Sequence, residues 1–244
     1  MFFMLLLKVR FDQITLPQIL SKVATWFADS RSHTIFTPNP EMLVAAHSQS
    51  EFLSVLNSSD INICDGVGAA WFLPGIQKIA GIDCLLEICG LCEKLGQSVF
   101  LLGSGKSAVV EKTASELKTQ FPNLIIAGID TGPRVNLVGM GESEMVIDKI
   151  ILSGPAVLFV AFGQQKQEMW IKRHLAELPS VKLAMGVGGA FDFISGNISR
   201  APCFWRQIGL EWLYRLFKQP RRFPRIFNAT VRFLFLVWRE KRLR

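Results

Sequence analysis

Residues 98–127 read SVFLLGSGKSAVVEKTASELKTQFPNLIIA: an apolar run, a glycine-containing turn, a longer amphipathic segment and a second apolar run. The apolar runs Ser98–Leu102 and Leu124–Ala127 have the length of strands, and residues 106–120 have the length of a helix. A strand, a helix and a second strand in this order predict a βαβ unit, in which both strands lie parallel in one sheet.

The same alternation continues on both sides of this unit. Further strands are expected at Phe2–Leu7, Thr34–Phe36, Ile61–Ile63, Ala156–Ala161 and Lys182–Val187, and further helices at 16–29, 41–56, 83–95, 141–152 and 164–176. The opening apolar run has no basic region before it and no cleavage site after it, so we expect a first buried strand there and not a secretory signal. The sequence thus predicts an α/β fold, with a mostly parallel sheet and helices on both faces.

Polar and glycine-rich segments follow the apolar runs. In an open parallel sheet, ligands bind beyond the carboxyl ends of the strands. The segments that follow the expected strands are TPNP at 37–40, DG at 65–66, GSG at 103–105, GID at 128–130, GQQ at 163–165 and GGA at 188–190. We therefore expect the functional site at this edge of the sheet.

Positive charge is concentrated in the last part of the chain. The formal net charge is +7, and 11 of the 27 Lys and Arg residues lie in 201–244, against two of the 20 acidic residues. Such a tail favours an anionic partner, which could be nucleic acid, anionic lipid or a phosphorylated substrate. The five cysteines show no disulfide framework, which favours a reducing cytoplasm, and Cys89 and Cys92 fit the core face of a helix.

The end of the tail has an amphipathic pattern. A polar stripe with helical spacing is surrounded by apolar and aromatic side chains, and it comprises Arg225, Asn228, Arg232, Arg239 and Arg242. A helix of this kind suits the plane of a membrane interface. The alternative is a helix that packs on the body of the protein, or on a second subunit, with its arginines in water.

Two segments at the expected edge offer polar groups for sugar chemistry. Asn39 fits a helix cap, with Pro40 in the first helical position. Pro38 and Pro40 also stiffen this segment, which would hold the Thr37 hydroxyl and the Asn39 amide in place for sugar hydroxyls. Asp65 fits either a turn before glycine or a general base that deprotonates an acceptor hydroxyl.

The turn at 103–108 allows a second class of function. Gly103-x-Gly105-x-x-Ala108 follows a strand and opens a helix, and Asp130 lies near the end of the next strand. This pattern is typical of dinucleotide-binding domains, so an NAD-binding oxidoreductase is the alternative hypothesis. Against it, nearly 100 residues precede the motif. In either case the glycines allow close backbone approach to a phosphate or nucleotide.

Two further segments and two absences narrow the chemistry. Residues 162–170 place a run of amides at a strand-to-helix junction, and three glycines at 186, 188 and 189 precede Asp192, which suits a nucleotide pocket. There is no Asp-x-Asp pair for a metal-held diphosphate, and the three histidines have no zinc spacing. We therefore expect no metal and no cofactor, with side-chain cations stabilising a departing diphosphate.

Taken together, these segments resemble the WecG/TagA/CpsF family of glycosyltransferases (family 26) over about residues 5–225. The matching stretches are 37–41 (TPNPE), 65–66 (DG), 80–83 (AGID), 101–103 (LLG), 159–170, 186–193, 200–202 (RAP), 209–215 (GLEWLYR) and 220–222 (PRR). The resemblance implies a Rossmann-like core over 1–195 and a basic helical appendage over 196–244 that faces membrane and acceptor. It also implies metal-independent, inverting transfer of N-acetylmannosamine, its uronic acid or a related hexose.

The resemblance also implies partners and site residues. The donor is a UDP-sugar, and the acceptor is N-acetylglucosamine on polyprenyl diphosphate, in cell-surface polysaccharide or teichoic acid synthesis. The enzyme is expected in the cytoplasm, peripheral on the inner face of the membrane. No nucleic acid partner is expected, and a homo-oligomer is compatible with the resemblance. The implied catalytic residues are Asp65 as general base with Thr37 and Asn39; the implied substrate or nucleotide contacts are Gly103, Gly105, Gln167, Gly186, Gly188, Gly189, Asp192, Lys78 and Asp83; the implied acceptor-diphosphate contacts are Arg215, Arg221 and Arg222.

This chain departs from the family pattern at two positions. The family usually has arginine before the Gly-x-Asp step, where this chain has Lys78, which keeps the charge without the bidentate fork. The family often reads Pro-Lys-Gln-Glu where this chain has Gln165 in place of the proline. Both exchanges bear on the preference for the donor sugar.

Overall fold

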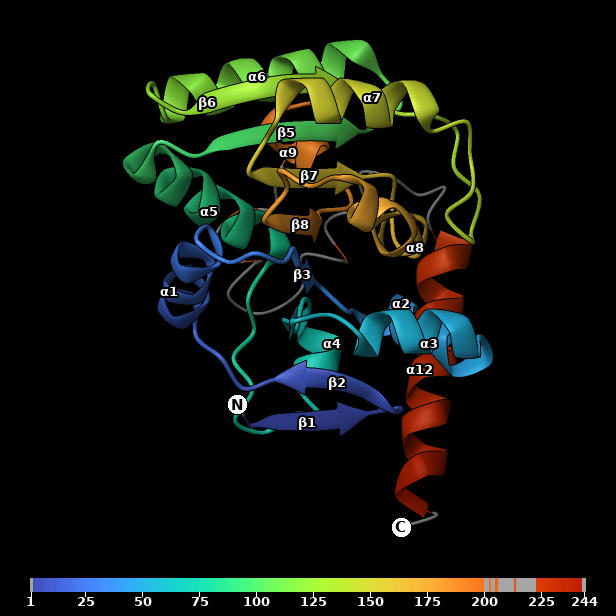
Figure 1. The fold of residues 1–244 in the computed structure, drawn as a ribbon. Helices are drawn as coiled ribbons and strands as arrows, with labels where there is room; N and C mark the ends of the chain where they lie inside the picture. Colours follow the sequence, from blue (N-terminus) through green and yellow to red (C-terminus); the bar gives the residue numbers. More distant parts are fainter. Residues whose placement is uncertain (1, 200–201, 203–204, 206–212, 214–222, 243–244) are drawn as a thin grey trace.

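A computed structural model describes residues 2–199, 202, 205, 213 and 223–242. Within this part of the chain, six parallel strands form one sheet in the order β4-β3-β8-β7-β5-β6 (Figure 1). The strands are β3 (His33–Phe36), β4 (Ile61–Asn62), β5 (Ser98–Gly103), β6 (Ile125–Asp130), β7 (Val157–Ala161) and β8 (Leu183–Gly186). β7 and β8 are buried along their whole length, as expected for parallel strands covered on both faces.

Helices cover both faces of this sheet, which confirms the predicted fold class. One face is covered by α2 (Pro40–Ser48), α3 (Ser50–Asn57), α7 (Glu144–Ser153) and α8 (Lys166–His174), and α12 (Phe223–Arg242) contributes to the same core beside α2. The other is covered by α1 (Leu16–Trp26), α5 (Gly81–Leu95), α6 (Ser107–Gln120) and α9 (Ala190–Ile194). The short helix α4 (Val67–Ala70) and the 3₁₀ turn η1 (Leu175–Glu177) complete the helical elements of the described residues. Cys89 and Cys92 are buried in the core, as their helical spacing predicts.

The first strand differs from the prediction. β1 (Phe3–Leu6) pairs with β2 (Val9–Asp12) in a separate antiparallel hairpin outside the main sheet. Phe3 and Leu5 face solvent, so the expectation of a buried strand was wrong for this half of the side chains. An apolar run of this length occurs both in a covered strand and in an edge hairpin, which explains the error.

The predicted helix over 41–56 is two helices. Gln49, between α2 and α3, has extended backbone dihedrals (φ −131°, ψ 100°) and so interrupts the helical ladder. Its side chain accepts a hydrogen bond from Nε2 of Gln165, at the start of α8. The residue at this break thus has a partner outside its own helices, a contact that helical periodicity alone does not predict.

α12 packs along the body of the protein, beside α2 (Figure 1). Phe233 and Val237 are buried in the core, and the Phe233 ring meets the Phe72 ring edge-on at 5.6 Å between centroids. At the other end of the contact, Oε2 of Glu240 accepts a hydrogen bond from the backbone N–H of Leu7 at 3.2 Å. The helix therefore ties the end of the chain to the hairpin at its beginning.

Candidate active site

The helices that follow neighbouring strands leave the sheet toward opposite faces. α2 after β3 and α8 after β7 pack into one core, whereas α9 after β8 and α6 after β5 pack into the other. These strands lie in the order β3-β8-β7-β5, so the direction alternates at every step. Such reversals open a crevice beyond the carboxyl ends of the strands, where α/β proteins bind ligands. In Figure 1 these ends point to the right, the side on which α12 also lies.

The two segments expected to carry the sugar chemistry lie side by side. The backbone N–H of Asp65 donates to the carbonyl of Pro38 at 3.3 Å. A Cβ on Gly68 would lie 3.1 Å from Cγ of Pro40, so the turn after Asp65 packs closely on the proline segment. Gly66 has φ +93°, a conformation that favours glycine. The carboxylate of Asp65 therefore belongs to the same small region as Thr37 and Asn39.

Asn39 and Thr37 have clear local roles. Oδ1 of Asn39 accepts hydrogen bonds from the backbone N–H groups of Glu41 and Met42, at 3.0 and 3.1 Å, and so caps α2. The carbonyl half of the amide is committed to the cap, and its NH₂ half could meet a sugar hydroxyl. Thr37 is buried against the start of α5, where a Cβ on Gly81 would lie 3.3 Å from the Thr37 methyl group.

Lys78 and Asp83 belong to the same end of the sheet. Lys78 is exposed and forms a parallel bridge with Cys64, the residue before Asp65. Burial raises the pKa of the Cys64 thiol to about 12, the Asp65 carboxylate adds to this, and the Lys78 ammonium opposes it. Lys78 and Asp65 are thus both close to the Cys64 thiol. Asp83 stands in the first turn of α5.

The glycine at the end of β5 allows the backbone to pack closely on the neighbouring strand. Gly103 has φ +122°, and a Cβ there would lie 2.6 Å from the carbonyl carbon of Ala161, so only glycine fits. Gly105 has φ +66° and nothing within 4 Å of such a Cβ, so its backbone borders open space. Asp130, the acid of the NAD hypothesis, accepts hydrogen bonds from Lys149 and from the backbone of Gly132, both at 2.8 Å. These bonds give no support to a ribose-binding role.

The amide segment before α8 is held under strain. Gln165 has φ 68° and ψ −53°, the dihedrals of a strained three-residue turn. Proline, whose ring holds φ near −65°, cannot adopt this conformation. The structure thus gives a physical reason why the chain, with this backbone, has glutamine where the family often has proline.

Gln167 is buried, with both ends of its amide paired inside the protein. Oε1 accepts a hydrogen bond from the backbone N–H of Gly188 at 2.9 Å, and Nε2 donates to Oε1 of Glu168 at 2.7 Å. A Cβ on Gly186 would lie 2.7 Å from Nε2 of Gln167, so this glycine leaves room for the amide. Gln167 therefore contacts the end of β8 from the protein interior and binds the backbone that follows it.

Asp192 lies in the first turn of α9, after Gly188 and Gly189. Oδ1 of Asp192 accepts a hydrogen bond from Nδ2 of Asn197 at 2.8 Å. Gly188 has φ +51° and open space around its Cα. These residues directly follow the carboxyl end of β8.

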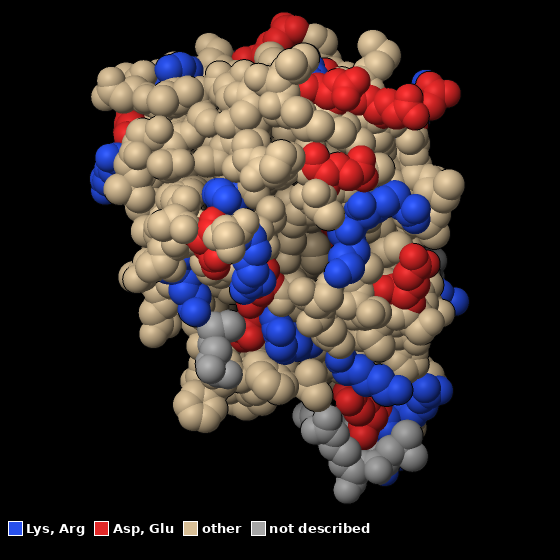
Figure 2. Space-filling view, viewed as in Figure 1, with Lys and Arg blue, Asp and Glu red and all other residues tan. Residues whose placement is uncertain are grey.

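The tail residues assigned to the acceptor diphosphate, Arg215, Arg221 and Arg222, lie outside the described residues. The domain boundary near residue 195 stays a prediction for the same reason. On α12 one face packs on α2, and the opposite face exposes large apolar side chains, namely Phe223, Phe227, Val231, Leu234, Phe235 and Trp238. Lys and Arg side chains gather near its lower end (Figure 2), among them the exposed Arg239 and Arg242. In the described part of the chain, no helix has the length and apolar content needed to cross a membrane.

Sequence reasoning missed one buried acid. Glu168 is completely buried, and burial raises its pKa to about 7, against the opposing hydrogen bond from Gln167. Its place in the first turn of a helix predicts a solvated residue; the signal that could have marked it is its position as the last residue of the family's Pro-Lys-Gln-Glu motif. Among the described residues, no three His, Cys, Asp or Glu side chains gather as a metal site. A hollow of about 300 Å³ between α5, α6 and α9 has none of the expected site residues in its lining.

Comparisons with known proteins identify the family of this chain. The model of the "Glycosyl transferase WecG/TagA/CpsF family" matches residues 4–244. The resemblance therefore extends beyond residue 225, where we expected it to end. A relative from Bacillus spizizenii is 33% identical over 87% of this chain and 82% of its own length. A relative from Staphylococcus aureus is 31% identical over 97% and 92%. Both are called N-acetylglucosaminyldiphosphoundecaprenol N-acetyl-beta-D-mannosaminyltransferase. The match of the family model to residues 4–244, together with these relatives, shows that this chain belongs to the WecG/TagA/CpsF family of glycosyl transferases.

Proposed function

We propose that this glycosyltransferase moves N-acetylmannosamine, its uronic acid or a related hexose from a UDP donor to N-acetylglucosamine on polyprenyl diphosphate. The observation that carries the proposal is the hydrogen bond between Asp65 and Pro38, which holds a carboxylate beside the Thr37–Asn39 segment at the sheet edge. The names of the relatives support the acceptor and the sugar.

The chemistry is a single displacement. The Asp65 carboxylate takes the proton of the acceptor hydroxyl, whose oxygen forms a bond to the anomeric carbon of the donor sugar. The bond from that carbon to the diphosphate oxygen breaks, UDP leaves with the electron pair, and the configuration at the carbon inverts. Lys78, close to Asp65, supplies one positive charge for the departing diphosphate without a metal. Arg215, Arg221 and Arg222 are the further cations in this proposal.

Asp65→Asn tests the general base. We expect turnover to fall by about 10²–10⁴ with UDP affinity nearly unchanged, because the amide keeps the shape but cannot accept the proton. Asp148→Asn, an exposed change on α7, is the matched control. Full activity of Asp65→Asn would remove Asp65 from the mechanism.

A second test concerns the absence of a metal: loss of wild-type activity in EDTA would contradict the metal-free chemistry. UDP at about 100 times its dissociation constant should stabilise the fold by about 2.7 kcal/mol; stabilisation by NAD instead would favour the oxidoreductase hypothesis.

We also propose that α12 holds the enzyme on the inner face of the cell membrane. Its exposed aromatic and aliphatic face, with Arg239 and Arg242 nearby, suits the interface of an anionic bilayer. Replacing Leu234 and Trp238 with serine spares the buried face of the helix, so the fold should stand. Binding to anionic vesicles should weaken while transfer to a soluble acceptor persists; Leu152→Ser on α7 is the control. Undiminished vesicle binding would show that this face of α12 is not the anchor.

A further inference from the structure

A buried chain of hydrogen bonds connects Glu168 to the end of β8. Oε1 of Glu168 accepts from Nε2 of Gln167 at 2.7 Å, and Oε1 of Gln167 accepts from the backbone N–H of Gly188 at 2.9 Å. Glu168 is 0% exposed and Gln167 is 2% exposed, so neither side chain reaches the crevice in this structure. Gly188, in contrast, borders open space at the carboxyl end of β8.

Glu168 is costly to keep in this place. Its Oε2 atom has no hydrogen-bond partner among the described residues, and burial raises the pKa of the carboxyl to about 7. A neutral side chain of the same size would fill the space without burying a charge or an unpaired oxygen. Costs of this kind concentrate where function requires a particular geometry.

The geometry that Glu168 provides is the orientation of the Gln167 amide. The oxygen and nitrogen ends of an amide have nearly the same shape, so packing alone does not select between them. The Oε1 atom of Glu168 accepts from the NH₂ end of the amide, and this bond turns the amide oxygen toward the N–H of Gly188. With the amide reversed, its NH₂ group would face the N–H of Gly188, donor against donor, and the backbone there would have to move.

Gly188 occupies a central place in the crevice. β8 lies between β3, which leads to Thr37 and Asn39, and β7, which leads to the strained Gln165. A Cβ on Gly186 would lie 2.9 Å from Oε1 of Glu168, so the strand end is moulded around this carboxyl as well. The conformation of the Gly186–Gly189 segment thus depends on a side chain that is completely buried.

We propose that Glu168 is a positioning residue of the transferase, which through Gln167 fixes the backbone at Gly188 and so sets the shape of the nucleotide pocket. This inference rests on the proposed function, because it takes the Gly186–Gly189 segment as a wall of the UDP site. Glu168 acts as a hydrogen-bond acceptor and takes no part in the proton transfer assigned to Asp65.

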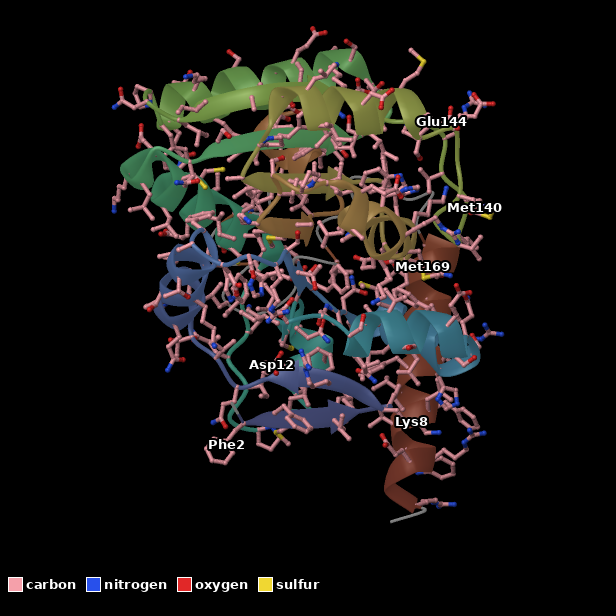
Figure 3. The ribbon with its side chains drawn as sticks, viewed as in Figure 1. Phe2, Lys8, Asp12, Met140, Glu144 and Met169 are labelled. Atoms are coloured by element: carbon pink, nitrogen blue, oxygen red, sulfur yellow. The ribbon has the colours of Figure 1, made fainter. Side chains whose placement is uncertain are left out.

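The test compares two replacements of Glu168 in the full chain. Glu168→Gln keeps an oxygen that can accept from Gln167, whereas Glu168→Met fills similar space without an acceptor. We expect Glu168→Met to raise the Kd for UDP, measured by calorimetry, by about tenfold, and to lower kcat/KM by at least as much. Glu168→Gln should stay within about threefold of wild type. Glu144→Gln and Glu144→Met, in the first turn of α7 away from Met169 (Figure 3), are the matched controls.

Stability separates positioning from simple support of the fold. Glu168→Gln removes a buried charge and keeps an acceptor, so it should resist urea at least as well as wild type near neutral pH. Glu168→Met also removes the charge but leaves the buried NH₂ group of Gln167 without its acceptor, so it should be less stable than Glu168→Gln. A variant that is fully folded under the assay conditions and yet binds UDP poorly has lost geometry and not folding. Unchanged UDP affinity in Glu168→Met would overturn the inference, as would an equal loss in Glu168→Gln, since that would show that charge matters and not the acceptor.

A double replacement tests the route through Gln167. If Glu168 acts only through this amide, Gln167→Met with Glu168→Met should bind UDP no more weakly than Gln167→Met alone. Losses that multiply would overturn the route. Asp65→Asn keeps the two proposals apart: if it abolishes turnover while Glu168→Met is fully active, the inference fails and the proposed function stands. If Asp65→Asn is fully active, Asp65 leaves the proposed mechanism; if wild type is stabilised by NAD and not by UDP, the proposed function fails and the inference about the UDP site fails with it.

Discussion

Wild type should lose stability with rising pH because of Glu168, and Glu168→Gln should not. Burial raises the pKa of Glu168 from its ordinary value of 4.5 to about 7. A carboxyl with a raised pKa in the folded state holds its proton more tightly there, so its contribution is complete below pH 4.5 and lost as pH rises through about 7. At about 1.4 kcal/mol for each pKa unit, wild type loses about 3 kcal/mol over this range. The neutral glutamine has no such loss.

The assay is urea unfolding of both proteins between about pH 5 and about pH 8, with stability taken from the midpoint and slope. All other titrating groups are shared, so the difference between the two proteins isolates Glu168. We expect Glu168→Gln to become more stable than wild type by about 3 kcal/mol near pH 8, less about 1 kcal/mol for a weaker bond to Gln167. The exposed Glu144→Gln should show a flat difference. A Glu168→Gln difference that stays constant across the range would refute the cost assigned to the buried carboxylate.

Two replacements probe other contacts at the strand ends. Gly103→Ala should destabilise the fold by on the order of 3 kcal/mol in urea unfolding, because its Cβ would meet the Ala161 backbone at φ +122°; a loss well under about 1 kcal/mol would mean that the turn relaxes easily. Ser143→Ala should cost about 1–3 kcal/mol, since it leaves the buried indole N–H of Trp170 without its acceptor, which now lies at 2.9 Å. Stability equal to wild type would show that water replaces the hydroxyl.

The alternation of strands and helices was predictable because parallel strands covered on both faces appear as short apolar runs. The same signal was ambiguous for the hairpin β1–β2. Its two-residue turn, Leu7–Lys8, has positive φ at both positions (49° and 67°), where a sequence would be expected to show Asn or Gly. The N–H of Leu7 is bound by the carboxylate of Glu240, so a contact distant in sequence supports the turn. The turn propensities of Leu7 and Lys8 therefore do not predict the hairpin.

Some residues of the candidate site could be predicted from the sequence, and others could not. Asp65 and the segment from Thr37 to Asn39 could be placed together from the sequence, because the carboxyl ends of neighbouring parallel strands share one edge. The role of Gln167 could not be foreseen, since an amide at a helix start suggests a group open to ligand, and here the fold encloses it. Glu168 was hidden for a stronger reason: its burial depends on how α8 settles on β7 and β8, and side-chain type alone predicts the opposite.

The contact between Leu7 and Glu240 has a consequence for synthesis on the ribosome. The two residues are 233 positions apart, and chains grow by roughly 5–20 residues per second, so the hairpin waits roughly 10–50 s for its partner. During this time the surface of α2 that later meets Phe233 and Val237 has no cover, although the βαβ units between them can already pair. The nascent chain thus leaves an apolar strip of α2 uncovered until α12 has emerged.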